Sequence, residues 1–456
     1  MASALEYAGT NAERFLAQLE DLTRIPSVST DPAFAGEIRR AAEWLADDMR
    51  RIGLEGVEIS PTEGHPVVYA EWLGAGTGAP TVLLYAHYDV QPAAREDGWD
   101  SEPFEPTRRD GRVFARGVGD DKLHTVMILK VAESLLNAEQ GCPVNLRIVL
   151  EGEEEMGSRN FAPWVRANRE RLSADYCLVC DSGIETPDTP IIHYALRGML
   201  AMEFAVHGPK ADLHSGLHGG RVHNPAQAVA EMVAKLHAED GSIAVPGFYE
   251  DVRGLAAEER AEMAKGGMSR DEFDAVIGAP EPWGEPGFTL EERATARPTL
   301  EINGIYGGYT GEGIKTVIPS RASAKITCRL VTDQKPERIY EQIEAYLREI
   351  APPTVRLEVE MQGRADPVIV PMESPLVQAY ARSMRKEWSR PPQYRRMGAS
   401  IPITPVIQSE LGTPTLIVGF NVLNGGFHGP NEFIHIDLFH RGTRTLIHLL
   451  EDLGGR

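Results

Sequence analysis

Four short apolar runs restrict the folds that are open to this chain. They are TVLLY at 81–85, LRIVL at 146–150, YCLVC at 176–180 and TLIVGF at 415–420, and a helical pattern at about 122–136 separates the first two. Wholly apolar strands that alternate with helices are typical of a mainly parallel sheet with helices packed on both faces. The sequence therefore predicts an α/β domain built from both ends of the chain.

The middle of the chain has a different pattern. MLAMEFAVHG at 199–208 and SRASAKITCRLVTD at 320–333 alternate apolar and polar residues with period two, and amphipathic helical patterns accompany them. Such alternation is typical of antiparallel strands that have one covered face. We therefore predict an α+β insertion at 198–365, with the α/β domain formed by 1–197 and 366–456.

One segment of the insertion shows neither the period-two pattern of a strand nor the amphipathic pattern of a helix. Residues 277–298 are rich in Pro, Gly and Glu, and Pro and Gly favour turns and loops. We predict an excursion loop there.

Charge and composition exclude several classes of partner and location. At 456 residues, with 42% hydrophobic and 25% charged side chains, the chain is long enough for two or more domains with their own cores. Its formal net charge of -21 argues against binding to nucleic acid or to an anionic membrane surface. No stretch approaches the ~20 apolar residues of a membrane span, and the N-terminal residues do not resemble a signal peptide. A cytoplasmic location is therefore expected.

The four cysteines do not indicate disulfides, because a disulfide framework needs more of them in a chain of this length. Cys177 and Cys180 form a CxxC pattern, but they lie inside the apolar run YCLVC. We predict that both are buried core thiols rather than redox or zinc-binding residues.

Polar side chains follow each of the four apolar runs. His87 and Asp89 follow the first, the glutamates of EGEEEMGS at 151–158 follow the second, Asp181 follows the third, and His428 comes after the fourth through a Gly-rich segment. In open α/β sheets, ligands bind at the carboxyl ends of the strands. The sequence thus predicts a binding site at this edge, lined by residues that can hold metals.

Each of these residues also has an ordinary structural explanation. A single glutamate run is usually a solvated loop, His87 could be a core histidine, and Asp181 could be a turn residue at a strand end. Asp120, in RGVGDDK, could cap the helix that follows it. The coincidence of all of them at one sheet edge favours a metal site.

A pair of divalent metal ions would explain why so many acidic residues lie together. We expect Asp120 to bridge two ions, with His87 and Asp181 completing one site and Glu155 and His428 the other. Three carboxylates against two dications leave one positive charge, which a bridging hydroxide would neutralise. Mixed nitrogen and oxygen ligands with an open position suit catalytic zinc, although manganese or cobalt would also fit.

Two further residues complete this hypothesis. Paired metals ~3.5 to 4 Å apart lower the pKa of a shared water and polarise a carbonyl, but a protein group must still move the protons. Glu154, which adjoins Glu155 in sequence, is the candidate general base and acid. Asp89, two residues after His87, is expected to orient the His87 imidazole.

The motifs together resemble a known enzyme family. The chain is similar, nearly end to end and in order, to the dinuclear zinc metallopeptidase family of aminoacylases, succinyl-diaminopimelate desuccinylases, glutamate carboxypeptidases and carnosinase-type dipeptidases. The sequences of its motifs look most similar to those of the cytosolic, carnosinase-like dipeptidases. The motifs that carry the resemblance are YAHYDVQP (85–92), RGVGDDK (116–122), EGEEEMGS (151–158), CDSG (180–183), DLHSGLHGG (212–220), KTVIP (315–319), GASIP (398–402) and FHGPNE (427–432).

The resemblance implies the same roles for the acidic residues as the charge argument. The bridging acid falls on Asp120, the general base on Glu154, and two metal ligands on Glu155 and Asp181. It also implies a cis peptide bond after Asp120. Glu153 adds an acid where relatives can be neutral, so the assignment within the glutamate run depends on its register against the following Met and Gly.

The resemblance further implies how the insertion acts. It would be a lid and dimerisation domain, and His214 would reach the active site of the neighbouring subunit in a homodimer. There it would stabilise the oxyanion, a contribution of roughly 3 to 4 kcal/mol. Thr316, Arg329 and Ser400 match substrate-contacting positions, and Arg329 would pair with a terminal carboxylate. Without the resemblance, Arg329 would be read as an exposed strand arginine.

Other chemistries fit the sequence less well. GYTGEGIKT at 308–316 nearly spells a phosphate-binding loop, but an extra residue precedes its lysine and a strand follows it. Neither an HExxH helix nor a GxSxG elbow is present. We therefore expect an exo-acting dipeptidase with a small peptide as substrate. The alternatives are an N-acyl amino acid deacylase or desuccinylase and, with less support, a non-catalytic metal or peptide-binding protein.

Overall fold

The chain forms two compact units. The computed structural model describes residues 2–401 and 403–456. Unit 1 comprises Met1–Tyr194, Val370–Arg395 and Ile401–Arg456, and unit 2 comprises Ala195–Ile369 and Arg396–Ser400. The unit boundaries thus fall at 194/195 and 369/370, compared with 197/198 and 365/366 in the sequence-based division.

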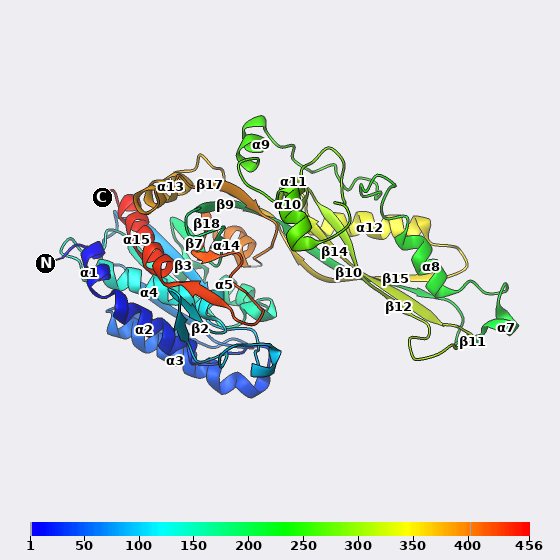
Figure 1. The fold of residues 1–456 in the computed structure, drawn as a ribbon, viewed down its shortest axis with the longest axis horizontal. Helices are drawn as coiled ribbons and strands as arrows, with labels where there is room; N and C mark the ends of the chain where they lie inside the picture. The colour runs from blue at the N-terminus through cyan, green and yellow to red at the C-terminus, as the bar shows by residue number, and fades with distance from the viewer. Residues whose placement is uncertain (1, 402) are drawn as a thin grey trace. The chain divides into compact units, whose positions relative to one another are not determined.

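Unit 1 is built around a mainly parallel sheet, as the apolar runs predicted (Figure 1). Its four central strands lie in the order β6, β3, β7, β18 and are mutually parallel. Antiparallel strands extend the sheet on both sides. The order is β1 (Glu55–Ser60), β2 (Val67–Trp72), β6 (Asn145–Glu151), β3 (Thr81–His87), β7 (Tyr176–Cys180), β18 (Thr415–Val418), β9 (Ile191–Leu196) and β16 (Val368–Ile369), and β17 (Gln393–Met397) also pairs with β9.

The central strands are apolar throughout because both faces of the sheet are covered. In β3, Leu84 and Ala86 belong to the main core, to which the almost completely buried helix α4 also contributes. Tyr85, which points the other way, makes an edge contact with Phe161 of α5. The helices of this unit are α1 (Ala4–Thr10), α2 (Ala12–Thr23), α3 (Ala35–Arg51), α4 (Leu123–Leu136), α5 (Phe161–Ala167), α6 (Arg169–Leu172), α13 (Pro375–Glu387), α14 (Ile403–Leu411) and α15 (Ile436–Leu453).

Short strands complete unit 1 around the carboxyl ends of the central strands. β8 (Gly183–Ile184) pairs with β19 (Asn421–Val422), directly beyond β7 and β18. A separate three-stranded sheet contains β4 (Thr107–Arg109), β5 (Arg112–Phe114) and β20 (Phe433–His435). These strands hold the loops that follow the central sheet.

Unit 2 is the α+β insertion that the period-two pattern predicted. Its antiparallel sheet has the order β12 (Thr299–Gly307), β14 (Arg321–Leu330), β10 (Gly198–His207) and β15 (Arg356–Ala365). One face packs on α8 (Pro225–Val233) and α12 (Pro336–Ile350) through a core that includes Phe204 and Ile326. Smaller elements are α7 (Ser215–His218), α9 (Ala257–Met263), α10 (Arg270–Glu272), α11 (Leu290–Thr295), β11 (Leu213–His214), β13 (Val317–Ile318) and β16 (Val368–Ile369).

The segment expected to be one long loop is more ordered than its composition suggested. Helix α11 lies inside 277–298 and begins with a capping box, in which Thr289 and Glu292 bond each other's backbone N–H groups. A capping box can start a short helix even in a Pro- and Gly-rich context.

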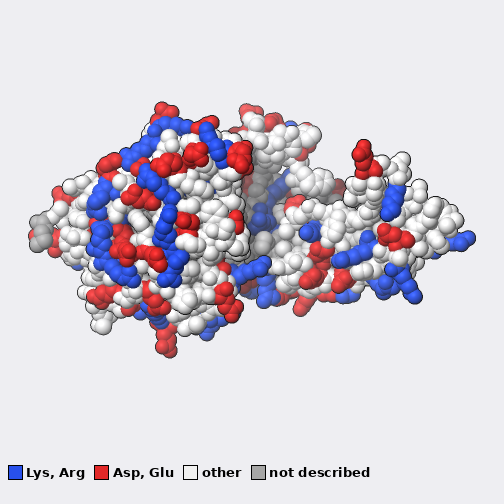
Figure 2. All heavy atoms as spheres, turned by 90° about the horizontal axis from the view of Figure 1, so that it is seen from below, with Lys and Arg blue, Asp and Glu red and all other residues white. Residues whose placement is uncertain are grey.

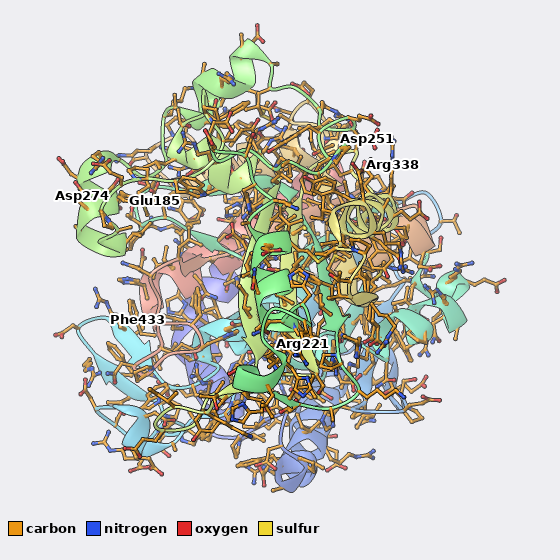
Figure 3. The ribbon with its side chains drawn as sticks, turned by 90° about the vertical axis from the view of Figure 1, so that its right-hand side faces the viewer. Glu185, Arg221, Asp251, Asp274, Arg338 and Phe433 are labelled. Carbon is orange, nitrogen blue, oxygen red and sulfur yellow. The ribbon has the colours of Figure 1, made fainter. Side chains whose placement is uncertain are left out.

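On the exposed side of α12, Arg338 donates to Asp251 at 2.7 Å, and the two side chains lie together in Figure 3.

Surface charge and thiols agree with the composition. On the face of unit 1 that Figure 2 presents, basic and acidic side chains lie next to each other. Exposed ion pairs of this kind include Arg39 and Glu43 of α3, at 2.8 Å. All four cysteines are buried and free, which confirms Cys177 and Cys180 as core thiols. Among residues 2–401 and 403–456, no helix combines the length and the apolar character that a bilayer span requires.

Candidate active site

The parallel register of unit 1 brings the chemically active residues to one edge. β3 ends at His87, β6 ends at Glu151 just before the glutamate run, and β7 ends one residue before Asp181. β3 is hydrogen-bonded to β6 on one side and to β7 on the other, so these ends lie next to one another. His428 follows β18 and β19, and its positive φ of 58° lies in the left-handed region.

Two groups of three residues at this edge could each hold a metal ion. The first is His87, Asp120 and Asp181, and the second is Asp120, Glu155 and His428; in each group the ligand atoms lie within 4.8 Å of one another. Asp120 belongs to both. Its Oδ1 is 3.1 Å from Nε2 of His87, and its Oδ2 is 3.1 Å from Nε2 of His428. The structure thus brings together all five residues that the sequence nominated as metal ligands.

The electrostatics of this edge show a strong excess of negative charge. Burial raises the pKa of Asp181 to about 7, with His87 opposing the rise and Asp121 and Asp120 adding to it. Burial likewise raises the pKa of Glu154 well above its usual value. Hydrogen bonds to Asp120 and Glu155 raise the pKa of His428 to about 10, because the acids favour a positive charge on the ring. The residues therefore attract cations, and two imidazoles with three carboxylates form a donor set that fits two divalent metals.

The glutamates of EGEEEMGS separate into different environments. Glu155 Oε2 is 3.2 Å from Nε2 of His428, so this residue faces the shared edge. Glu153 turns away and accepts a hydrogen bond from Asn160 at 2.9 Å, and Glu151 accepts one from Tyr85 at 2.6 Å. Glu154 is buried beside the same edge, and no described residue makes a hydrogen bond to its carboxylate. Among these glutamates, Glu155 is thus the one that meets His428, and the assignment of base and ligand within the run stays a prediction.

Asp89 contacts more of the site than the sequence suggested. Its backbone oxygen lies 3.1 Å from Nδ1 of His87, and its carboxylate is 3.4 Å from the same nitrogen. The carboxylate also accepts the backbone N–H groups of Glu154 at 3.2 Å and Glu155 at 3.0 Å. Asp89 thus fixes two segments relative to each other, and the imidazole is oriented chiefly through its main chain.

The loop that carries Asp120 is held by a residue that sequence reasoning missed. Glu432 accepts the backbone N–H groups of Gly117, Gly119 and Asp120 at 2.9, 2.9 and 3.0 Å, and Arg116 donates to it at 2.6 Å. Its presence in the FHGPNE motif was the only available signal. The peptide bond from Asp120 to the next residue is cis, as the resemblance implied.

A second missed residue contacts the glutamate run. Gln91 donates from Nε2 to Oε2 of Glu155 at 2.8 Å, so one carboxylate oxygen meets both this amide and His428. Gln91 is the penultimate residue of YAHYDVQP and lies four positions after His87. Its neighbours in the motif carried the resemblance, but nothing in the local pattern indicated an amide contact to Glu155.

The remaining predicted residues all belong to unit 2. His214 is exposed at the end of β11, and its Nδ1 accepts the N–H of Gly216 at 3.0 Å. Thr316 lies beside it, just before β13, which pairs with β11. Farther along the unit, Arg329 donates to Oγ of Ser400 at 3.0 Å. The structure therefore groups these four residues into two pairs, both within unit 2.

Comparison with known proteins points to one family. A family model described as peptidase family M20/M25/M40 matches residues 83–452. The Cys-Gly metallodipeptidase of Candida albicans is 28% identical over 452 residues, which are 95% of this chain and 93% of that protein. The human Beta-Ala-His dipeptidase is 27% identical over 461 residues, covering 97% of this chain and 91% of that protein.

Solved structures of peptidases also superpose on this chain over nearly its whole length. An M20 family metallo-carboxypeptidase from Sulfolobus solfataricus superposes with a TM-score of 0.85 at 29% identity, covering 97% of this chain and 99% of that one. Human carnosine dipeptidase 1 superposes with a TM-score of 0.81 at 26% identity, covering 99% and 98% of the two chains.

Proposed function

Because the chain belongs to peptidase family M20/M25/M40, we propose that it is a metal-dependent dipeptidase, an exo-acting hydrolase of the amide bond in small peptides. The observation that carries this proposal is the carboxylate of Asp120, whose two oxygens each lie 3.1 Å from a different imidazole. One bridging carboxylate between two mixed nitrogen and oxygen groups is an arrangement suited to two catalytic metals. The dipeptidase names of relatives that align over nearly their whole length support the substrate class.

The proposed metal ligands divide into two sets around Asp120. His87 and Asp181 would hold one ion, and Glu155 and His428 the other. Zinc is the proposed metal because the donors are imidazoles and carboxylates, and manganese or cobalt would also fit. When bound, such a pair polarises a carbonyl and lowers the pKa of a shared water.

Glu154 is proposed to transfer the protons of the reaction. It would accept a proton from the attacking water on its carboxylate and donate that proton to the nitrogen of the departing amine. Its support is positional: its main-chain N–H is held by Asp89, it adjoins Glu155, and its carboxylate has no hydrogen-bond partner among the described residues.

The residues of unit 2 are proposed to act on the substrate. In a homodimer, the partner subunit's His214 would donate a hydrogen bond to the developing oxyanion, and Thr316 would contact the substrate beside it. Arg329, already oriented by Ser400, would pair with the terminal carboxylate of the peptide. His214 is exposed and not committed to an acid, which suits this role.

We also propose that the enzyme works in the cytoplasm without a nucleic acid or membrane partner. The support is the set of four free, buried thiols, which suits a reducing compartment, together with the net charge of -21.

The decisive test is a Glu154→Gln variant. It should lose turnover of dipeptides by roughly 10²- to 10⁴-fold and still hold two metal ions per chain, measured by elemental analysis after gel filtration. A Glu153→Gln variant is the matched control, because Glu153 bonds to Asn160 instead, and it should remain active. Turnover near the parent level in Glu154→Gln would contradict the assignment of the base. Faster hydrolysis of acetyl or succinyl amino acids than of dipeptides would identify a deacylase instead.

A further inference from the structure

A second site of interest is a cavity contained within unit 2. Its volume is about 580 Å³, and it lies between the four-stranded sheet and the segment at 268–294. We call it the arginine pocket, after Arg197, Arg293 and Arg329, which all line it. Its size is in the range of about 300 to 1,000 Å³ that is usual for small-molecule sites.

The floor of the arginine pocket follows from the register of the sheet. β12 and β14 place Thr299 opposite Arg329 and Glu301 opposite Thr327. Because side chains alternate along a strand, these four residues point away from the face that packs on α8 and α12. They form a polar floor on the outer face of the sheet.

The roof of the pocket is apolar and partly open to solvent. Phe273 is buried there, whereas Met268, Ile277 and Trp283 are 37%, 54% and 70% exposed. Figure 1 shows α11, which contributes Leu290 to this roof, beside one end of the sheet. Large apolar side chains gathered around a cavity are typical of a binding surface rather than of ordinary protein surface.

The three arginines share the pocket with two carboxylates, Glu291 and Glu301, but the hydrogen bonds of Arg197 and Arg329 go to other groups. Arg197 donates to the main-chain oxygens of Gly398 at 2.8 Å and Arg297 at 3.5 Å, and Arg329 donates to Ser400. Nε of Arg293 is buried without a hydrogen-bond partner.

The cavity is lined by more cations than anions, with three arginines against Glu291 and Glu301. Burial, and then the charge of Arg329, lower the pKa of Arg197 to about 10, while Glu301 opposes this effect. Buried guanidinium groups are usually paired, because an unpaired buried charge is costly. A ligand carboxylate would supply such a partner, and the apolar roof would cover whatever is attached to it.

We propose that the arginine pocket binds the carboxyl-terminal residue of the substrate and selects a large apolar side chain at that position. The inference rests on the proposed function, in which Arg329 receives the terminal carboxylate. Arg197 and Arg293 would add positive charge around that group. The side chain would pack on Ile277 and Trp283, and Glu301 on the floor would repel an acidic side chain.

The first test compares substrates that differ only in the second residue. With the full-length, metal-loaded protein, kcat/KM for Ala-Phe and Ala-Leu should exceed that for Ala-Gly by roughly 10-fold or more, and Ala-Asp should be a poor substrate. Equal values for Ala-Phe and Ala-Gly would overturn the inference. A preference for Ala-Lys would overturn it too, because Glu301 would then dominate recognition.

Neighbouring residues provide a matched pair of variants. Ile277→Ala should lower the ratio of kcat/KM for Ala-Phe over Ala-Gly by roughly 10-fold, which is the order of effect of an apolar pocket contact. Val276→Ala should leave this ratio unchanged, because Val276 is 75% exposed and does not line the cavity. Trp283→Ala tests the rim at a second, exposed position. Equal ratios in the Ile277 and Val276 variants would contradict the proposal.

A binding measurement separates this inference from the catalytic proposal. Calorimetric titration of the same protein with L-phenylalanine should show binding that is roughly 10-fold or more tighter than that of L-phenylalaninamide, which lacks the carboxylate. Glycine should bind more weakly than phenylalanine. Binding of phenylalanine without hydrolysis of any dipeptide would overturn the proposed function and support the pocket. Hydrolysis with no difference among these ligands would overturn the pocket alone.

Discussion

The acidic edge of unit 1 and the arginine pocket of unit 2 are opposite in charge and in construction. The acidic edge gathers carboxylates at the buried carboxyl ends of parallel strands, where Asp89 and Glu432 fix the backbone. The pocket gathers guanidinium groups on the outer face of an antiparallel sheet, under a roof with exposed apolar residues. In each region one charge exceeds the other: carboxylates outnumber imidazoles in the proposed metal groups, and three arginines face two glutamates in the pocket. Such an excess is expected of sites that receive ions or charged ligands.

The acidic edge is more deeply buried than the rim of the arginine pocket, and this difference fits the different ligands proposed for them. Metal ligands need a rigid geometry, and the backbone N–H groups of Asp120 and Glu155 are held by the carboxylates of Glu432 and Asp89. A side-chain pocket must accept more than one shape, and the arginine pocket has an apolar rim that is open to solvent. Function therefore depends on a rigid site in one unit and a more adaptable surface in the other.

The largest effect on the acidic edge is expected from removing Asp120, which belongs to both groups of proposed metal ligands. Asp120→Ala should lower dipeptide turnover by roughly 1,000-fold or more, because two bound metals contribute several kcal/mol to the reaction. The variant should also lose both metals rather than one, since Asp120 belongs to both groups. Metal content and kcat measured on the same preparation check this, and full retention of two metals would contradict the bridging role.

The next largest effect is expected at His214. His214→Ala should lower kcat by roughly 10²- to 10³-fold, the usual cost of one oxyanion donor, without loss of metal. Mixing this variant with Glu154→Gln should restore part of the activity if each site takes His214 from the partner subunit. His207→Ala is a control on the same unit, since His207 pairs with Glu358 instead. No recovery in the mixture would argue against the shared site.

A smaller effect is expected at Glu432, which supports the acidic edge without being a proposed ligand. Glu432→Gln replaces one of two acceptor oxygens that together serve three backbone N–H groups and Arg116. Metal affinity should fall by roughly 10- to 100-fold, as for other residues that orient ligands. Competition with a chromogenic chelator measures this directly. Unchanged affinity would show that the loop carrying Asp120 is held by other contacts.

The smallest effect on activity is expected where buried charge is already paired. Glu133 in α4 bonds to Arg14 at 2.7 Å and to Arg51 at 2.8 Å, close to the pair of Lys130 and Asp48. Burial would raise the pKa of Glu133, but these arginines outweigh it and lower the pKa to about 2. Glu133→Gln should leave metal content and kcat unchanged but reduce the free energy of unfolding by about 3 kcal/mol at pH 7.

The stability lost in Glu133→Gln should depend on pH in a defined direction. Because the folded-state pKa of Glu133 lies below its ordinary value of 4.5, the stabilisation is complete above about pH 4.5 and disappears as pH falls toward about 2. Urea unfolding of the parent and the variant at pH 7, 5 and 3.5 measures the difference between their free energies of unfolding. This difference should be the same at pH 7 and pH 5 and smaller at pH 3.5. A difference that grows on acidification would contradict the assignment.

Much of the acidic edge could be predicted from the sequence because its signals are local. The apolar runs that became β3, β6, β7 and β18 are continuous, and His87 and Asp181 lie at or directly after strand ends. Parallel strands place their carboxyl ends at one edge, so the order of elements along the chain was enough to predict a cluster. The antiparallel insertion was predicted for the same kind of reason, namely its period of two.

The contacts that were missed are formed between distant parts of the chain. Glu432 meets the N–H groups of Gly117 and Asp120, more than three hundred positions earlier, through hydrogen bonds to backbone that no sequence pattern marks. Gln91 donates a side-chain hydrogen bond to the carboxylate of Glu155, which follows a different strand. Helix α11 was not expected because its capping box lay in a segment whose composition indicated a loop.

The sequence by itself determined the four central strands of unit 1, the period-two strands of unit 2 and the polar residues that follow the central strands, because hydrophobic periodicity and strand ends are properties of neighbouring residues. Only the tertiary structure decided that Asp120 shares its two oxygens between two histidines and that three arginines line one pocket. Those outcomes depend on strand register and on loop closure, and both are set by packing between segments that the sequence order keeps far apart.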